Sequence, residues 1–352
     1  MTLPPEPALE PLAGVAADPQ PGASAQPGSA RGPWATAFRR LRRNRSAVAS
    51  ALVLLAVVAM TLLAPVYAAW LGTDPFRSNL SGQVVIDGAM VPVMQQSTTG
   101  LGLGVTPIGP TWDLGGYMLG ADNQGRDVAA RLLYGGRNSL LIAGAATALC
   151  LVMATLVAVV AGFLGGITDM VLSRVLDVLW AFPVYLLAIS LSIVLLTSSI
   201  AIGPLVITAG SLLLPIGIIA VIYVPYVARP MRARVLTLRQ SEFVLAAIGL
   251  GLPTPRILRR DILPNLMPTI IVFVPILLAL AIVTESALSY LSIGVQPPDA
   301  SWGTIIQDGQ NLLYSRPAVA LAPGIAIVVT VLALNVLGDA VRDALDVRGQ
   351  GR

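Results

Sequence analysis

Long apolar runs divide the chain into segments of membrane length. No charged residue occurs from Ser46 to Trp70, from Ser139 to Ile167 or from Val178 to Ala228. A helix needs about 20 apolar residues to cross the roughly 30 Å hydrocarbon core of a bilayer. The last of these stretches is therefore long enough for two crossings, and Gly203-Pro204 is the natural turn between them.

Two further apolar runs, from about Leu266 to Leu288 and from about Ala318 to Leu337, bring the expected number of crossings to six. The second crossing is expected over residues 139–163, after which Asp169 and Arg174 lie in a short turn. The pattern predicts an all-α polytopic membrane protein with six transmembrane helices. Because six is even, both termini are expected on one side of the membrane.

Four regions follow from this pattern. Residues 1–34 are rich in Pro, Ala, Gly and Ser, a composition typical of a disordered tail. Residues 35–70 hold a basic segment and the first span, which is too long and too far from the N-terminus for a signal peptide. Residues 71–138 form a large polar loop in which residues 83–93 alternate as short strands do, and residues 139–348 form a core domain with five spans.

The composition supports a membrane location. The chain is 55% hydrophobic and only 11% charged, whereas soluble domains carry about a quarter charged residues. Its net charge of +4 comes from arginines that cluster beside the apolar runs, which is a pattern of membrane orientation. We therefore expect contact with membrane lipid and no binding of nucleic acid.

The distribution of arginine predicts the orientation. If the N-terminus is inside, the inner segments hold 17 arginines and the outer segments hold 5. Positive residues favour the cytoplasmic side. Both termini and residues 229–265 are therefore expected in the cytoplasm, and residues 71–138 outside it. The bias towards Ala, Gly, Val, Leu and Arg suits a bacterial genome, so we expect a multi-pass protein of the bacterial cytoplasmic (inner) membrane.

Several kinds of chemistry are excluded by residues that the sequence lacks. The phosphate-binding P-loop needs a lysine, and the chain has none. With no histidine and a single cysteine, Cys150, the chain offers neither a usual zinc site nor Ser-His or Cys-His catalysis. The chain is therefore expected to be no enzyme and to bind no metal or cofactor itself. Cys150 lies in an apolar run and is expected to be a packing residue.

The loop from Glu242 to Pro264 carries a possible docking element. Four residues recur at the i, i+3, i+4 and i+7 positions that make one apolar face of a short helix: Phe243, Ala246, Ala247 and Leu250. Such a face can fit into the groove of a partner protein. Gly251 is placed to end this helix, and Leu263-Pro264 is expected to end a second short helix before span five.

Two carboxylates lie near the ends of apolar runs. Ionisable groups there usually face a bundle interior or a cavity. Glu285, near the outer end, is expected either to form structural hydrogen bonds or to line a translocation path. Asp177, near the inner end, is expected to pair with Arg174, and Trp302 to anchor the outer membrane interface.

The segment before the second span is amphipathic. Gly125, Arg126, Asp127 and Arg131 lie among apolar residues in a stretch suited to the membrane interface, although a solvated basic helix is an alternative. Asp127 and Arg131 have the i, i+4 spacing of a helical ion pair.

These motifs resemble a known family. The loop reading EFVLAAIGLGLPTPRILRRDILP is similar to the signature loop of ABC importer permeases, although Leu245 stands where an acidic residue is usual and Asp261 where isoleucine is common. Three other segments resemble the C-type permease subunit of dipeptide and oligopeptide importers: LGADNQGRDVAARLLYGGRNSL (119–140), ESALSYLSIGVQPPDASWG (285–303) and LGDAVRDALDVR (337–348).

The resemblance implies a type I ABC importer permease fold and a subunit that moves peptides into the cell. Implied partners are a second homologous permease subunit, two ABC ATPase subunits that hold ATP and Mg, and an extracytoplasmic peptide-binding protein. The 242–264 loop would couple the chain to the ATPases. Related permeases for nickel, glutathione or another small solute share these motifs, so the substrate stays open. An ion-coupled secondary carrier is the alternative from another class, but it needs buried carboxylates near the membrane midplane.

Overall fold

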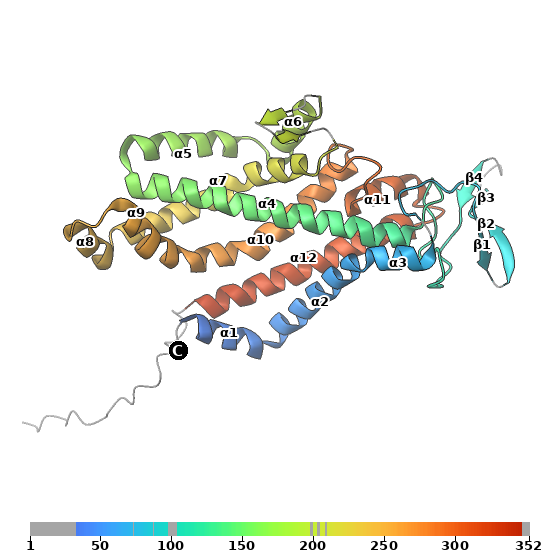
Figure 1. Cartoon of the computed structure of the whole chain (residues 1–352), viewed down its shortest axis with the longest axis horizontal. Coiled ribbons are helices and arrows are strands. Elements are labelled where there is room, and N and C mark those ends of the chain that lie inside the picture. The colour runs from blue at the N-terminus through green and yellow to red at the C-terminus, as the bar shows by residue number, and fades with distance from the viewer. Residues whose placement is uncertain are drawn as a thin grey trace, which may run out of the picture.

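The computed structural model describes residues 33–346, apart from 73, 87, 98–103, 198–199, 203–204 and 208–209. This part of the chain is an elongated bundle of helices with small two-stranded hairpins (Figure 1). The expected disordered tail lies outside the described residues except for its last two positions, and the expected turn at Gly203-Pro204 lies outside them as well.

Five helices in the described part are long and apolar enough to cross a membrane, and they confirm five of the expected spans. They are α2 (Arg45–Leu62), α4 (Val128–Leu164), α7 (Leu213–Arg239), the continuous helix Thr254–Tyr290 that contains α10 (Leu263–Tyr290), and α12 (Ala318–Leu345). Most extend beyond their predicted limits, because polar residues at a helix end do not interrupt the backbone hydrogen bonds.

The remaining expected span is bent. Helices α5 (Gly166–Ala181) and α6 (Val184–Thr197) meet at an angle of 93°. Phe182 between them is extended, with ψ 137°, because the ring of Pro183 disfavours a helical residue before it. The predicted short turn around Asp169 and Arg174 is wrong, since both residues lie within α5.

Most of the shorter elements lie at the two ends of the bundle (Figure 1). The alternation over residues 83–93 predicts short strands, and the structure has β1 (Gln83–Ile86) and β2 (Ala89–Pro92), which pair antiparallel. The other elements are α1 (Pro33–Arg43), α3 (Ala64–Leu71), β3 (Met94–Gln96), β4 (Val105–Pro107), β5 (Ile200–Ile202), β6 (Leu205–Ile207), α8 (Glu242–Gly249), α9 (Thr254–Ile257), a π-helical turn (Leu258–Ile262), α11 (Trp302–Gly309) and a 3-10 turn (Gln310–Leu312). We call the end with α8 and α9 the α8 end, and the end with α11 and β1–β4 the α11 end (Figure 1).

Small side chains allow the central helices to pack closely. Helix α4 packs along α7, and its buried face includes alanines at 143, 146, 154, 158 and 161. A Cβ added at Gly162 would lie 2.9 Å from Val235 of α7, so only glycine permits this approach. Helix α10 packs against α12, α4 and α7, and α2 lies along α12 and α4. Close backbone contact of this kind is typical of membrane helices.

Candidate functional site: a docking loop and two polar clusters

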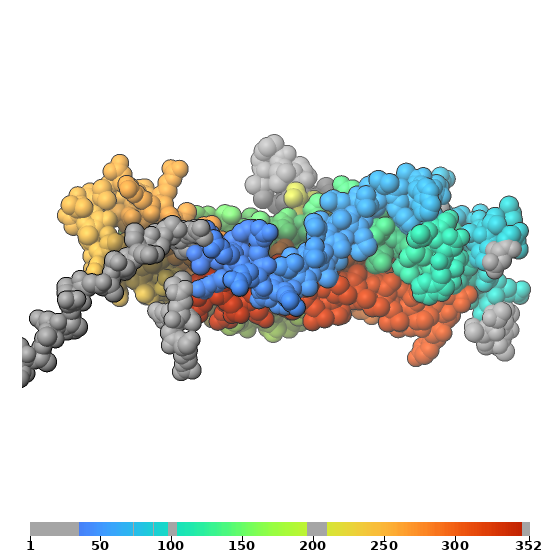
Figure 2. Space-filling model, turned by 90° about the horizontal axis from the view of Figure 1, so that it is seen from below, coloured from blue at the N-terminus to red at the C-terminus, as the bar shows by residue number. Residues whose placement is uncertain are grey.

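The loop between α7 and α10 projects from the bundle at the α8 end (Figures 1 and 2). It forms α8, a turn, and α9, which confirms the expected helix, turn and helix. Glu242 lies in the first turn of α8, where its negative charge is favoured by the helix dipole.

Helix α8 presents most of its apolar side chains outward. Val244 and Ala247 are buried against the chain, with exposed fractions of 0% and 7%. The outward face consists of Phe243, Leu245, Ala246, Ile248 and Leu250. The predicted face is therefore right for Phe243, Ala246 and Leu250 and wrong for Ala247, because Val244 and Ala247 lie one turn apart on the inner side. We call the five outward residues, Phe243, Leu245, Ala246, Ile248 and Leu250, the α8 outer face.

Gly251 ends α8 as predicted. Its φ is +73°, a left-handed conformation that favours glycine. The Leu252 N–H donates to the Ala247 carbonyl at 3.1 Å, and the Gly251 N–H donates to the Ile248 carbonyl at 2.9 Å. This pair of hydrogen bonds is a Schellman motif, which satisfies carbonyls that the helix end leaves free.

The prediction that Pro264 ends the second short helix is wrong. Leu263 and Pro264 lie in the first turn of α10, directly after the π-helical turn 258–262. Pro264 lacks an N–H and follows directly on this π-helical turn, where the regular α-helical hydrogen-bond pattern is already interrupted. One continuous helix, Thr254–Tyr290, therefore runs from α9 into the membrane-spanning part.

Ion pairs fix α5 to α7 in the half of the bundle nearer α8. Asp177 accepts a hydrogen bond from Arg229 at 2.8 Å and lies 3.7 Å from Arg174. The expected ion pair with Arg174 is therefore confirmed, and Arg229 is a second partner of Asp177. The Arg229 guanidinium lies over the Trp180 ring, 5.1 Å from its centroid. Asp177 is 51% exposed and Arg229 is 38% exposed, which indicates a structural contact at the helix surface.

Glu285 lies inside the bundle with no exposed surface. Its Oε2 accepts a hydrogen bond from the Ser139 hydroxyl at 2.7 Å, and its Oε1 accepts one from the Ser289 hydroxyl at 2.6 Å. The Ser139 oxygen also accepts the backbone N–H of Trp302 at 3.1 Å. Glu285 therefore connects α4, α10 and α11, and this geometry supports the structural alternative over a path-lining role.

A second polar cluster lies at the α11 end, and we call it the α11-end ion cluster: Asp122, Arg126, Arg131 and Asp308. Asp122 pairs with Arg126 at 2.7 Å and with Arg131 at 3.1 Å. Asp308 pairs with the same two arginines at 2.9 and 2.8 Å. Burial raises the pKa of Asp308, and the charge of Arg126 opposes this. Arg126 and Arg131 are buried and point towards Asp308 of α11, whereas the position of this segment at the membrane interface stays a prediction.

Asp127 does not pair with Arg131, contrary to the prediction from their spacing. It is the N-cap of α4, where its Oδ1 accepts the Ala130 N–H at 2.9 Å, while its Oδ2 accepts the Tyr117 N–H at 2.6 Å. Burial raises the pKa of Asp127 despite these hydrogen bonds. With both carboxylate oxygens occupied by backbone groups, Asp127 fixes the start of α4.

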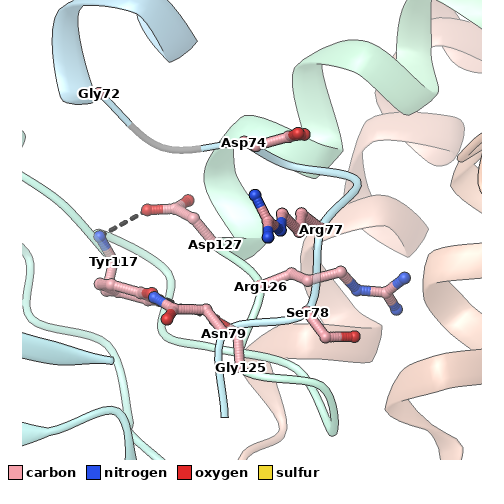
Figure 3. A pocket seen from close by; sticks show the side chains of 9 residues that line it. All are labelled: Gly72, Asp74, Arg77, Ser78, Asn79, Tyr117, Gly125, Arg126 and Asp127. Atoms are coloured by element: carbon pink, nitrogen blue, oxygen red, sulfur yellow. Dashed lines mark hydrogen bonds between the residues drawn. The ribbon is translucent and has the colours of Figure 1, made fainter. Parts of the chain in front are cut away.

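A polar cavity of about 390 Å³ lies beside Asp127 (Figure 3). Gly125 lines it with φ +71°, and an added Cβ would lie 2.3 Å from the Asn79 carbonyl oxygen. The predicted motif residue Gly125 is thus required by a tight turn. The Asn79 amide donates to the Tyr117 hydroxyl at 2.9 Å, which joins the polar loop to this turn.

Trp302 is buried, not interfacial as predicted. It is 2% exposed, and its indole N–H donates to the Leu132 carbonyl at 3.1 Å. A Cβ added at Gly136 would lie 2.9 Å from the indole ring, so this glycine makes room for it. Trp302 therefore packs α11 against α4.

Sequence reasoning missed Asp122, Asp308 and Ser139. Asp122 and Arg126 have the i, i+4 spacing of an ion pair, and that spacing could have identified Asp122. Asp308 and Ser139 carry no local signal, because their partners lie more than 140 positions away in the chain. Among the described residues no three metal-ligating side chains gather into a site.

Residues 154–349 match the family described as binding-protein-dependent transport system inner membrane component, and residues 32–81 match the N-terminal TM domain of oligopeptide transport permease C. The chain is 31% identical to a dipeptide transport system permease protein of Alkalihalophilus pseudofirmus, over 89% of this chain and 90% of that protein. It is 33% identical to an oligopeptide transport system permease protein of Bacillus subtilis, over 89% of each. It is also 31% identical to a glutathione transport system permease protein of Pectobacterium atrosepticum, over 90% of this chain and 92% of that protein.

Proposed function

The chain belongs to the family of binding-protein-dependent transport system inner membrane components, and on that premise we propose that it is the permease subunit of an ATP-driven importer of di- and oligopeptides. Its partners are a second permease subunit, two ATPase subunits that bind ATP and Mg, and an extracytoplasmic peptide-binding protein. Two relatives with dipeptide and oligopeptide in their names, matched over almost the whole chain, support the peptide substrate.

The observation that carries this proposal is the α8 outer face. Four large apolar side chains are 47–80% exposed on a helix that projects beyond the bundle: Phe243, Leu245, Ile248 and Leu250. Exposed apolar groups on a projecting helix are typical of a surface that a partner covers. We assign the ATPase subunit as that partner, which places the α8 end in the cytoplasm.

Both ends of the described chain support this orientation. Helix α1, with the arginines Arg39, Arg40, Arg42 and Arg43, packs against α12. Figure 1 shows α1 and the C-terminal end of α12 towards the α8 end. A cytoplasmic α8 end therefore puts both termini and most of the arginines inside, in agreement with the positive-inside rule.

The proposed mechanism is alternating access driven by the ATPases. Closure of the ATPase dimer moves α8, and the continuous helix Thr254–Tyr290 carries this movement towards the opposite end. There the Glu285 hydrogen bonds and the α11-end ion cluster hold α11 and α4 together, so the two helices move as one unit. The spans then open to receive a peptide from the binding protein.

A cysteine cross-linking experiment tests the docking assignment. The one native cysteine, Cys150, is buried, so an introduced cysteine is the reactive one. Leu245→Cys on the outer face should cross-link to the ATPase subunit in membranes, whereas Val244→Cys on the inner side should not. Cross-linking of neither variant to the ATPase would contradict the assignment.

The substrate needs its own experiment, because one relative carries glutathione in its name. The complete complex should be purified with its binding protein, and the bound solute identified by mass spectrometry. Di- or oligopeptides are expected, and uptake of labelled peptide into proteoliposomes should depend on ATP. Glutathione as the bound solute would favour the alternative permease.

A further inference from the structure

An apolar groove of about 520 Å³ lies near the α11 end, between α2 and α3 on one side and α4, α12 and α11 on the other. Its walls include Val57, Leu63, Leu132 and Val329, with Trp302 at its base. Figure 2 shows α2, in blue, lying along α12, in red. We infer that this groove is a lipid site that holds an acyl chain of a membrane phospholipid, with Tyr67 at the level of the ester groups.

The position of the groove supports a lipid occupant. Three of the helices that form it, α2, α4 and α12, are long and apolar enough to span a membrane. Met60, Ile325 and Val329 on its rim are 39–61% exposed, so the groove opens on the outside of the bundle. Membrane-spanning helices are surrounded by the acyl chains of lipids. An apolar groove that opens towards these chains is filled by an acyl chain rather than by water.

Tyr67 supplies the polar contact that a phospholipid would use. Its hydroxyl is buried in the groove wall and has no hydrogen-bond partner in the described structure. A buried donor without an acceptor is unfavourable. In the lipid-bound protein the Tyr67 side chain would turn its hydroxyl out into the groove, where the ester carbonyl at the head of an acyl chain is an acceptor of the right kind. Tyrosine is enriched at the depth where ester groups lie.

The size of the groove argues against a helix of a partner subunit. One helical turn with its side chains is roughly 10 Å across and 5.4 Å high. A partner helix lying along the groove would need several turns. A flexible chain a single methylene wide fits the space without separating α2 from α12.

Photo-labelling of the complete complex tests the inference. Vesicles would contain a phospholipid with a diazirine on its acyl chain, and labelled residues would be mapped by mass spectrometry. Trp302 and Ala129 are the diagnostic positions, because they are 2% and 5% exposed and a lipid reaches them only through the groove. We expect label at both positions and none at Ile142, which is buried outside the groove.

Two variants of α12 separate groove binding from general contact with the bilayer. Ala326→Phe fills the groove and should remove most label from Trp302 and Ala129. Leu321→Phe adds an aromatic ring at an exposed position outside the groove and should leave that label unchanged. Absence of label at Trp302 and Ala129 while exposed Leu332 is labelled would overturn the inference. So would equal labelling in Ala326→Phe, or a partner segment found cross-linked in the groove.

Discussion

The Ser139 hydroxyl donates a 2.7 Å hydrogen bond to the Glu285 carboxylate, across 146 positions of sequence and in the fully buried interior of the bundle. Through the same serine oxygen, Glu285 is linked to the backbone of Trp302 at the start of α11. One carboxylate therefore organises the junction of α4, α10 and α11. An experiment can therefore distinguish the two expected roles of Glu285, which are structural hydrogen bonding and lining a translocation path.

We predict that Glu285→Leu lowers thermal stability, because it leaves the hydroxyls of Ser139 and Ser289 without their acceptor. Each buried hydroxyl left unsatisfied costs about 1–3 kcal/mol. Glu285→Gln keeps an acceptor oxygen and should be affected less. The measurement is thermal unfolding in detergent, followed by intrinsic fluorescence. Unchanged unfolding temperatures together with lost transport would instead assign Glu285 to the translocation path.

The second prediction concerns pH. Burial raises the pKa of Asp127 above its ordinary value of 3.8, and the nearby charge of Asp122 raises it further. The folded protein therefore binds this proton more tightly than the unfolded chain does. The stability that Asp127 contributes is complete below pH 3.8 and is lost as the pH rises through the raised pKa.

Asp127→Asn should remove this contribution, so the variant should show a flatter decline of unfolding temperature as the pH rises above about 4. The exposed Asp113→Asn in the same loop is the matched control and should keep the wild-type slope. An unaltered slope for Asp127→Asn would show that other groups govern the pH dependence.

The third prediction concerns the α11-end ion cluster. Asp122 is 1% exposed and pairs with Arg126 and Arg131, so Asp122→Ala leaves buried positive charge with Asp308 alone. Removing one partner of a buried ion pair costs about 3–5 kcal/mol. Asp113 is exposed, so Asp113→Ala should lower the free energy of unfolding far less.

A double substitution tests whether this cost comes from unpaired charge. Adding Arg131→Met to Asp122→Ala should recover part of the lost stability, because it removes one of the two buried cations. Additive losses in the free energy of unfolding would show that the two residues act independently.

The sequence predicts the helices better than it predicts their polar contacts. The apolar runs predict five of the spans. The left-handed conformation of Gly251 is predictable as well, because a glycine directly after a short helix commonly ends that helix. The bend at Phe182-Pro183 has a local cause that could have been recognised, since proline restricts the residue before it.

Predictions of polar partners were wrong where tertiary contacts override the local spacing of residues. Asp127 and Arg131 have ion-pair spacing, but the N-cap position commits the carboxylate to backbone N–H groups. Arg131 pairs instead with Asp122 and with Asp308, and Asp308 lies 177 positions away. Trp302 was expected at the membrane interface because tryptophan is common there, but α11 folds back against α4 and buries it. Such contacts depend on how distant helices pack, which no local pattern encodes.

The last prediction concerns coupling through Gly251. A side chain in its left-handed conformation costs about 1 kcal/mol or more, yet an added Cβ would meet no atom within 4 Å. Gly251→Trp should therefore insert into the membrane and fold. Its altered turn would reorient the α8 outer face, and its ring would meet the ATPase surface. We expect ATP-driven uptake in proteoliposomes to be abolished, while ATP hydrolysis is lost or continues without transport.

Gly249 provides the matched control for the backbone effect. It also has no neighbour within 4 Å of an added Cβ, but it lies in the last turn of α8 with a helical backbone. Gly249→Ala should therefore leave uptake close to wild type, whereas Gly251→Ala should reduce it, because only the second substitution strains the Schellman turn. Normal uptake and normal substrate-stimulated hydrolysis in Gly251→Trp would show that this loop is not the coupling element.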